Sequence, residues 1–267
     1  MTEKLMEIRD VTQRFRNAER EVVAVSRVSV QVDAGSVTCL VGESGSGKTT
    51  LARIAAGLDK PTAGSIHYRG QDISQLRGPD FMRFRREVQY VHQDPYASLN
   101  PTRTVLSTLL SALGARRNRT RRRATELLER VELTPADLFL ERYPHQLSGG
   151  QRQRVALARA LATEPALIIA DETTSMLDAS IRGSMINLLS ELRDDLGVGF
   201  LFITHDFTLA RHFAWRGRTA VLYLGELVEY GPTPEVMDAP KHAYTKALID
   251  ALPMIRFDDA DVPDGAP

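Results

Sequence analysis

The sequence predicts an α/β fold, in which a mostly parallel sheet flanked by helices is joined by an N-terminal antiparallel β subdomain and an α-helical insertion. Three observations support it. A glycine-rich segment, residues 42–50, joins an apolar strand to a helix, and a later apolar strand ends in Asp171 and Glu172. Between them, residues 102–143 show helical character and no convincing strand, which marks the insertion.

Composition limits the classes of protein to consider. The 267 residues can bury a full core, as one large domain or as a domain carrying an inserted subdomain. Thirty-four basic and 34 acidic residues balance, so the whole molecule has no bias toward polyanions. Cys39 is the only cysteine, which rules out an internal disulfide or a cysteine-built metal cluster and fits a reducing compartment. No apolar run reaches signal-peptide or membrane-span length, so we expect a cytosolic protein that can still sit against a membrane protein.

Two strands are expected before the glycine-rich segment, from Leu5 to Phe15 and from Val22 to Val32. Phe15 stands just before the polar stretch 16–20. Its ring could stack on a flat base, although a phenylalanine in a strand is more often simply buried.

Residues 42–50 read Gly-Glu-Ser-Gly-Ser-Gly-Lys-Thr-Thr, between the apolar run 37–41 and a helix that begins near Lys48. Such glycines let several backbone N–H groups converge on one anion, and the helix start adds the positive end of its dipole. In this pattern the lysine places a charge on the β- and γ-phosphates and the following threonine binds Mg²⁺. We therefore predict a nucleoside triphosphate site whose phosphate loop is Gly42, Glu43, Ser44, Gly45, Ser46, Gly47, Lys48, Thr49 and Thr50.

The segment after this loop alternates turns with short elements. Pro61 and Gly64 precede an expected strand at 65–68, residues 81–86 suggest a short basic helix, and 88–91 suggest a strand. Residues 92–101 contain Gln93, are rich in turn formers and lack periodicity. We expect a loop there, and loops with specific polar residues often carry function.

The helical insertion holds a dense basic run, and a second helix start follows it. The run could bind nucleic acid or lipid headgroups, but it has no interleaved aromatic residues, so a solvated helix face is favoured. Its members are Arg116, Arg117, Arg119, Arg121, Arg122 and Arg123. Further on, Ser148 is expected to cap a helix over 152–161, and Gly149 and Gly150 again expose backbone N–H groups to an anion.

The acidic pair and a histidine end two expected parallel strands. Asp171 fits the Mg²⁺-side acid beside a phosphate loop, and Glu172 could activate a water molecule. His205 follows the apolar strand 199–204, and the carboxyl ends of parallel strands face the ligand crevice. A hairpin around Gly225 is expected next, then a helix with Thr233 as N-cap and Pro234 in its first turn; the tail from Arg256 is expected to fray.

With these pieces in place, the chain resembles the ATP-binding subunits of ABC transporters over almost its full length. Six motifs in order carry the resemblance: the phosphate loop 42–50, Gln93, the signature 147–151, the acid pair 171–172, the segment 175–178 and His205. The resemblance implies a P-loop NTPase core at 1–93 and 157–230. It also implies an α-helical subdomain at 94–156 and a C-terminal helical extension at 231–267.

Two further stretches are similar to the oligopeptide-importer branch, which also includes nickel and oligosaccharide importers. They are the loop 93–101 and the ending from Tyr230 through Leu248. Two departures from the family pattern, Thr173 in place of proline and Met176 in place of alanine, alter the segment that meets the opposing subunit.

The resemblance also implies a mechanism, with ATP and Mg²⁺ as cofactors. Two subunits close head to tail around two ATP molecules, and each signature (Leu147, Ser148, Gly149, Gly150 and Gln151) acts on the ATP of the other chain. Phe15 stacks on adenine, Lys48 binds phosphate, Thr49 and Gln93 ligate Mg²⁺, and Asp171 supports the metal through water. Glu172 polarises the attacking water, His205 bridges it to the γ-phosphate, and Asp178 belongs to the loop at the subunit interface.

The implied partners are a second ATP-binding subunit, two integral membrane permease subunits and, indirectly, an extracytoplasmic substrate-binding protein. The branch favours a heterodimer over a homodimer, and nucleic acid is not expected as a partner. The implied location is peripheral, at the cytoplasmic face of a bacterial or archaeal cell membrane.

Two alternatives to an importer subunit stay open. One is an ABC-type ATPase that serves a soluble enzyme complex, such as those of phosphonate breakdown. The other is an ABC protein acting on nucleic acid or ribosomes, which the single phosphate loop and modest length disfavour.

Overall fold

The computed structural model describes residues 3–251 apart from 18–19, 95–97, 115–116 and 176. Its apolar runs form a six-stranded sheet in the order β10-β9-β3-β8-β7-β6. All neighbouring strands run parallel except β10, which pairs antiparallel with β9. The strands are β3 (Val37–Val41), β6 (Val88–Val91), β7 (Leu167–Asp171), β8 (Gly199–Thr204), β9 (Arg218–Tyr223) and β10 (Glu226–Pro232). Every residue of β3, β7 and β8 is buried, as expected of central strands covered on both faces.

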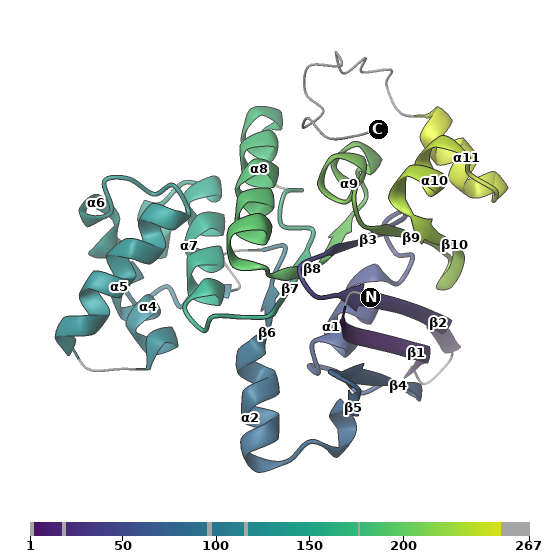
Figure 1. Ribbon diagram of the computed structural model, residues 1–267, viewed down its shortest axis with the longest axis horizontal. Helices are drawn as coiled ribbons and strands as arrows, with labels where there is room; N and C mark the ends of the chain where they lie inside the picture. Colours follow the sequence, from purple (N-terminus) through teal and green to yellow (C-terminus); the bar gives the residue numbers. More distant parts are fainter. Residues whose placement is uncertain (1–2, 18–19, 95–97, 115–116, 176, 252–267) are drawn as a thin grey trace.

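A four-stranded antiparallel sheet, in the order β2-β1-β4-β5, lies beside the first (Figure 1). Its strands are β1 (Lys4–Asn17), β2 (Arg20–Asp33), β4 (Ala63–Tyr68) and β5 (Gln71–Asp72). The two expected N-terminal strands are thus present, and both are longer than the sequence suggested. The predicted α/β fold, with its antiparallel N-terminal sheet, is confirmed.

Helices cover both faces of the parallel sheet. Helix α1 (Lys48–Ala55) contributes to one hydrophobic core together with the inner face of the antiparallel sheet. The other core joins α8 (Ala179–Leu196) and α9 (Phe207–Phe213) to the helical insertion. Helix α2 (Gly78–Glu87) precedes β6, where a basic helix was expected, and a 3₁₀ turn covers Ile73–Gln75.

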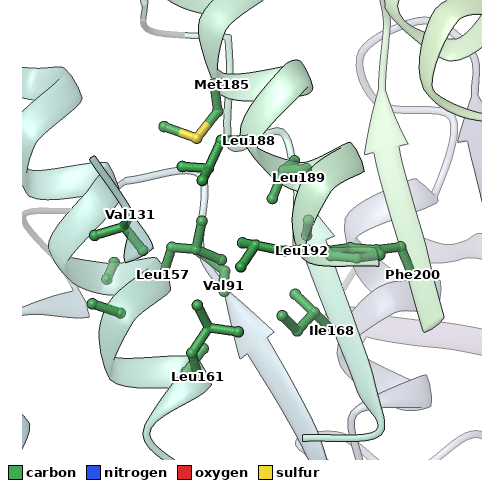
Figure 2. Packing of buried hydrophobic residues seen from close by; sticks show 14 of the residues in the cluster. Val91, Val131, Leu157, Leu161, Ile168, Met185, Leu188, Leu189, Leu192 and Phe200 are labelled. Atoms are coloured by element: carbon green, nitrogen blue, oxygen red, sulfur yellow. The ribbon is translucent and has the colours of Figure 1, made fainter. Parts of the chain in front are cut away.

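The insertion forms a helical lobe to one side of the sheet (Figure 1). It consists of α4 (Val105–Leu113), α5 (Arg117–Arg130), α6 (Asp137–Leu140), a 3₁₀ turn (Pro144–Gln146) and α7 (Gly149–Leu161). Figure 2 shows Leu157 and Leu161 of α7 packed toward Ile168 of β7 and Leu188 of α8. Helix α7 is therefore the main structural link between the lobe and the sheet.

The basic run of α5 forms a solvated face, as predicted, for the three arginine side chains that the structure describes. Arg121 contacts Glu141, Arg122 contacts Glu126, and Arg123 contacts Glu126 and Glu164, all at exposed positions. Exposed ion pairs of this kind contribute little stability. Arg116 and the side chains of Arg117 and Arg119 lie outside the described residues.

The C-terminal part begins with the predicted hairpin. Leu224 and Gly225 both have positive φ, 49° and 85°, which matches a two-residue turn between right-twisted strands. Helices α10 (Thr233–Asp238) and α11 (Ala243–Asp250) follow it. Within the described residues, no helix combines the length and apolar character that crossing a membrane requires.

The prediction that Thr233 caps α10 is wrong. Pro232 occupies the N-cap position, and Thr233 is the first helical residue. Its fully buried hydroxyl instead pairs with that of Thr219 in β9 at 2.9 Å. The Thr233 side chain, which the local sequence pattern assigned to capping, therefore hydrogen-bonds to Thr219 on a neighbouring strand.

This buried hydroxyl pair gives a stability prediction. Thr233→Val should lower the free energy of unfolding by about 1–3 kcal/mol, because the Thr219 hydroxyl would be left buried without its partner. Adding Thr219→Val removes both hydroxyls and should recover most of that loss. Urea unfolding of the two single variants and the double variant measures this; a double variant less stable than either single one would contradict it.

Candidate active site

The phosphate loop lies between β3 and α1, as the sequence predicted. Gly42, Gly45 and Gly47 have φ values of 151°, 82° and 99°, in the region that favours glycine. A Cβ at Gly42 would lie 2.2 Å from the Leu222 carbonyl oxygen, and one at Gly47 would lie 2.2 Å from that of Ala24. Neighbouring strands thus enclose the loop so closely that glycine is required at both positions.

Lys48 is folded back into this loop and its side chain is only 3% exposed. Its Nζ donates to the carbonyl oxygens of Gly42 at 2.8 Å and Glu43 at 2.7 Å, and lies 3.8 Å from Glu172 Oε1. Burial lowers the pKa of this ammonium, and the nearby carboxylates, Glu172 first, oppose that shift. The ammonium is thus held at the loop by backbone carbonyls and is placed to exchange them for an anion.

Asp171 lies at the carboxyl end of β7 with a hydroxyl donor on each carboxylate oxygen. Thr49 Oγ1 donates to Oδ1 at 3.1 Å, and the Tyr90 hydroxyl donates to Oδ2 at 2.5 Å. Burial raises the pKa of Asp171, whereas the hydrogen bonds from Tyr90 and Thr49 oppose the rise. The carboxylate is therefore fixed in orientation beside the first turn of α1.

These oxygen donors fit a magnesium ion. Mg²⁺ prefers oxygen ligands and usually takes only one or two from the protein, the others coming from water and phosphate. Thr49, Asp171 and the Gln93 amide offer oxygen atoms near the phosphate loop. Within the described residues, no group of three histidine, cysteine or acidic side chains is placed to hold a metal ion by itself.

Glu172 adopts a left-handed backbone conformation, with φ of 46°. Its N–H donates to the Ile203 carbonyl at 3.0 Å, and the Ser175 hydroxyl donates to its carbonyl oxygen at 2.9 Å. Such a conformation costs a non-glycine residue on the order of 1 kcal/mol or more and persists only where neighbours enforce it. The local turn therefore aims the carboxylate.

Gln93 and His205 converge on that carboxylate. Gln93 Nε2 donates to Glu172 Oε2 at 3.1 Å and to Ser175 Oγ at 3.3 Å, and His205 Nδ1 lies 3.6 Å from Oε2. All three residues border a pocket of about 540 Å³. The lining is formed by Gly42, Glu43, Ser44, Gln93, Glu172, Ser175, His205, Phe207 and Leu248.

Other predicted residues lie outside this lining. Ser148 is the N-cap of α7, as expected, and forms a capping box with Gln151 in which each side chain accepts the other's backbone N–H. Asp178 precedes α8 and is exposed. Phe15 is 48% exposed in β1, opposite Val22 of β2. Met176 lies outside the described residues.

Several residues of the site were not predicted. Tyr90 and Ser175 contact the acid pair directly. The Tyr244 hydroxyl accepts a hydrogen bond from the Glu43 N–H at 3.2 Å, and its ring contacts that of Tyr223 at a centroid distance of 4.1 Å. Together with Leu248 in the pocket lining, this places α11 against the phosphate loop. The only sequence signal was the resemblance of residues 240–248 to one family branch.

Comparison with known proteins places these features in a family. A family profile described as "ABC transporter" matches residues 25–175, and one described as "Oligopeptide/dipeptide transporter, C-terminal region" matches residues 228–265. The oligopeptide transport ATP-binding protein AppF of Bacillus subtilis (strain 168) is 42% identical over 266 residues, covering 95% of this chain and 80% of AppF. The glutathione import ATP-binding protein GsiA of Escherichia coli (strain K12) is 42% identical over 263 residues, covering 94% of this chain. The chain spans only 42% of GsiA's length.

The fold is also similar to that of a solved ATP-binding cassette. The ATP-binding cassette MJ0796, solved as a dimer in a post-hydrolysis state with ADP and Pi, superposes with a TM-score of 0.76 at 32% identity. That match covers 86% of this chain and 99% of MJ0796. Since the first profile spans more than half of the chain and AppF is similar over nearly all of it, the chain belongs to the ABC transporter family of ATP-binding proteins.

Proposed function

We propose that this chain binds ATP with Mg²⁺, hydrolyses it and thereby energises an ABC importer for oligopeptides or related solutes such as nickel or oligosaccharides. The observation that carries the proposal is the convergence of Lys48, Asp171 and Glu172 at the carboxyl ends of β3 and β7. In the sheet, β8 lies between these two strands. The carboxyl ends of the strands of a parallel sheet form the usual ligand crevice. A phosphate loop, a metal-side acid and a candidate base meet there.

The proposed roles combine the family resemblance with the geometry of the site. The loop's N–H groups and Lys48 hold the phosphates, and Thr49, Gln93 and Asp171 hold Mg²⁺, which neutralises charge on the phosphate oxygens when bound. Glu172 accepts a hydrogen bond from the attacking water, which polarises and orients that water. His205 bridges the same water to the γ-phosphate. Phe15, at the exposed end of β1, stacks on adenine.

The proposal includes a second ATP-binding subunit. Ser148 and the glycines after it lie outside the pocket lining, yet they present a capped helix start, which suits a phosphate. In a closed pair, residues 147–151 act on the ATP of the other chain, and Asp178 lies at the interface. The dimer of MJ0796 with ADP and Pi supports such an arrangement. A heterodimer with a paralogue is the favoured pairing.

The membrane partners are assigned to a second hollow of about 340 Å³. It lies between α2 and the helical insertion and is bordered by Arg85, Tyr90, His92 and Arg159. We propose that it receives a helix of one of two permease subunits, supplied with substrate by an extracytoplasmic binding protein. The proposal locates the chain at the cytoplasmic face of the membrane.

We also propose, from the family resemblance, that the chain divides into a core at 1–93 and 157–230, a helical subdomain at 94–156 and an extension at 231–267.

Co-purification tests this assignment. The chain, tagged in its native cell and extracted with mild detergent, is expected to retain integral membrane permeases and a second ATP-binding subunit. The C-terminal match to oligopeptide and dipeptide transporters supports that expectation. Retention of soluble enzyme subunits in place of permeases would contradict it, as would DNA- or RNA-stimulated ATP hydrolysis.

A further inference from the structure

Tyr90 connects the metal-side carboxylate to the neighbouring strand. It lies on β6, paired in parallel register with Ile169 of β7, two residues before Asp171. Its hydroxyl donates to Asp171 Oδ2 at 2.5 Å, while Thr49 donates to Oδ1. Because each oxygen has its own donor, the carboxylate cannot rotate about its Cβ–Cγ bond without breaking a hydrogen bond to the buried group.

The same side chain borders the hollow assigned above to a permease helix. Tyr90, His92 and Arg159 all line that hollow, and the ring of His92 meets the Tyr90 ring edge-on at a centroid distance of 4.5 Å. Tyr90 thus donates a hydrogen bond to the active-site carboxylate and also lines this hollow, which is called the groove below.

We propose that Tyr90 is a positioning residue for Asp171 and that it joins this carboxylate mechanically to the groove wall. The inference rests on the proposed function, in which Asp171 supports Mg²⁺ on ATP. A small displacement of the Asp171 carboxylate on metal binding, with its hydrogen bond to Tyr90 kept, would move the Tyr90 hydroxyl, and through the rigid ring it would move the groove wall against His92. The groove would then report the state of the metal site.

Nucleotide binding with and without Mg²⁺ tests the first part of the proposal, that Tyr90 positions Asp171. Tyr90→Phe keeps the ring and removes the hydroxyl. For the full chain, the affinity for a non-hydrolysable ATP analogue in the presence of Mg²⁺ should fall about 10-fold, as is usual when an outer partner of a metal-binding group is lost. The affinity measured in EDTA should not change. Calorimetric titration gives both values without any activity measurement.

Tyr68→Phe is the matched control. The Tyr68 hydroxyl donates to Glu87 Oε2 with a donor–acceptor distance of 2.6 Å, and neither residue belongs to the proposed ATP site. It should leave both affinities unchanged. Equal Mg²⁺ dependence in Tyr90→Phe and the parent chain would overturn the inference. A parent chain that binds the analogue no better with Mg²⁺ than in EDTA would instead contradict the proposed function.

A fluorescent dye attached in the groove tests the second part of the proposal, the mechanical link between Asp171 and the groove wall. Ala112 lines the groove from α4, and Cys39 is fully buried, so Ala112→Cys provides a selectively reactive thiol. Saturating Mg²⁺ and analogue should change the emission of the attached dye, and adding Tyr90→Phe should reduce that change at least about threefold at equal saturation. An absent change in Ala112→Cys alone, or an undiminished change in the double variant, would refute the mechanical link.

Discussion

Replacing Glu172 with glutamine is expected to lower steady-state ATP hydrolysis by about 10²–10⁴-fold, the usual effect of losing a positioned general base. An amide can still accept the hydrogen bond that Gln93 donates to Oε2, so the pocket should keep its shape. It cannot polarise water as a carboxylate does. ATP binding in the presence of Mg²⁺ should therefore persist, and the closed pair of subunits should accumulate with ATP trapped inside.

The measurement is phosphate release by the chain assembled with its partners, together with nucleotide occupancy after gel filtration. Glu191→Gln is the control, since Glu191 is an exposed residue on α8 away from the pocket lining. It should hydrolyse ATP like the parent. Unchanged turnover in Glu172→Gln would remove this carboxylate from the mechanism.

Replacing Lys48 with alanine is expected to weaken ATP binding by roughly 10²-fold, because hydrogen bonds to a charged group contribute a few kcal/mol. The ammonium now satisfied by the Gly42 and Glu43 carbonyls would no longer be available to the β- and γ-phosphates. Burial lowers the pKa of Lys48, so keeping its charge inside the loop already costs the folded chain free energy in the absence of nucleotide.

Titration with ATP measures that loss, and a thermal unfolding scan of the same variant separates binding from folding. Lys60→Ala, at an exposed position after α1, should match the parent in both experiments. Parent-like ATP affinity in Lys48→Ala would show that the loop does not use this side chain for phosphate.

The sequence allowed prediction where the functional residues lie close together in a short motif or at the end of an apolar strand. The phosphate loop could be predicted because its glycines, lysine and threonine sit in one strand–turn–helix unit, and the structure shows why Gly42 and Gly47 admit no side chain. Asp171, Glu172 and His205 could be placed together because they end adjacent parallel strands. Ser148 could be assigned as a cap because its partner, Gln151, is three residues away.

Prediction failed where the decisive contact joins distant parts of the chain. Nothing near Tyr90 indicated that its hydroxyl reaches Asp171, 81 residues later. Tyr244 reaches Glu43 across 201 residues, and only the packing of α11 reveals it. Thr233 was assigned to a local cap although its hydroxyl bonds Thr219 across the hairpin. Such contacts depend on strand register and helix docking, which no short motif encodes.

The central claim is that each catalytic pocket is shared between two chains. The most direct measurement is the structure of the assembled complex of the Glu172→Gln variant with ATP and Mg²⁺. We expect Ser148 within hydrogen-bond distance of the γ-phosphate of the ATP held by the opposing subunit's phosphate loop. A γ-phosphate that faces solvent in that complex, together with full turnover by the isolated parent monomer, would contradict the account.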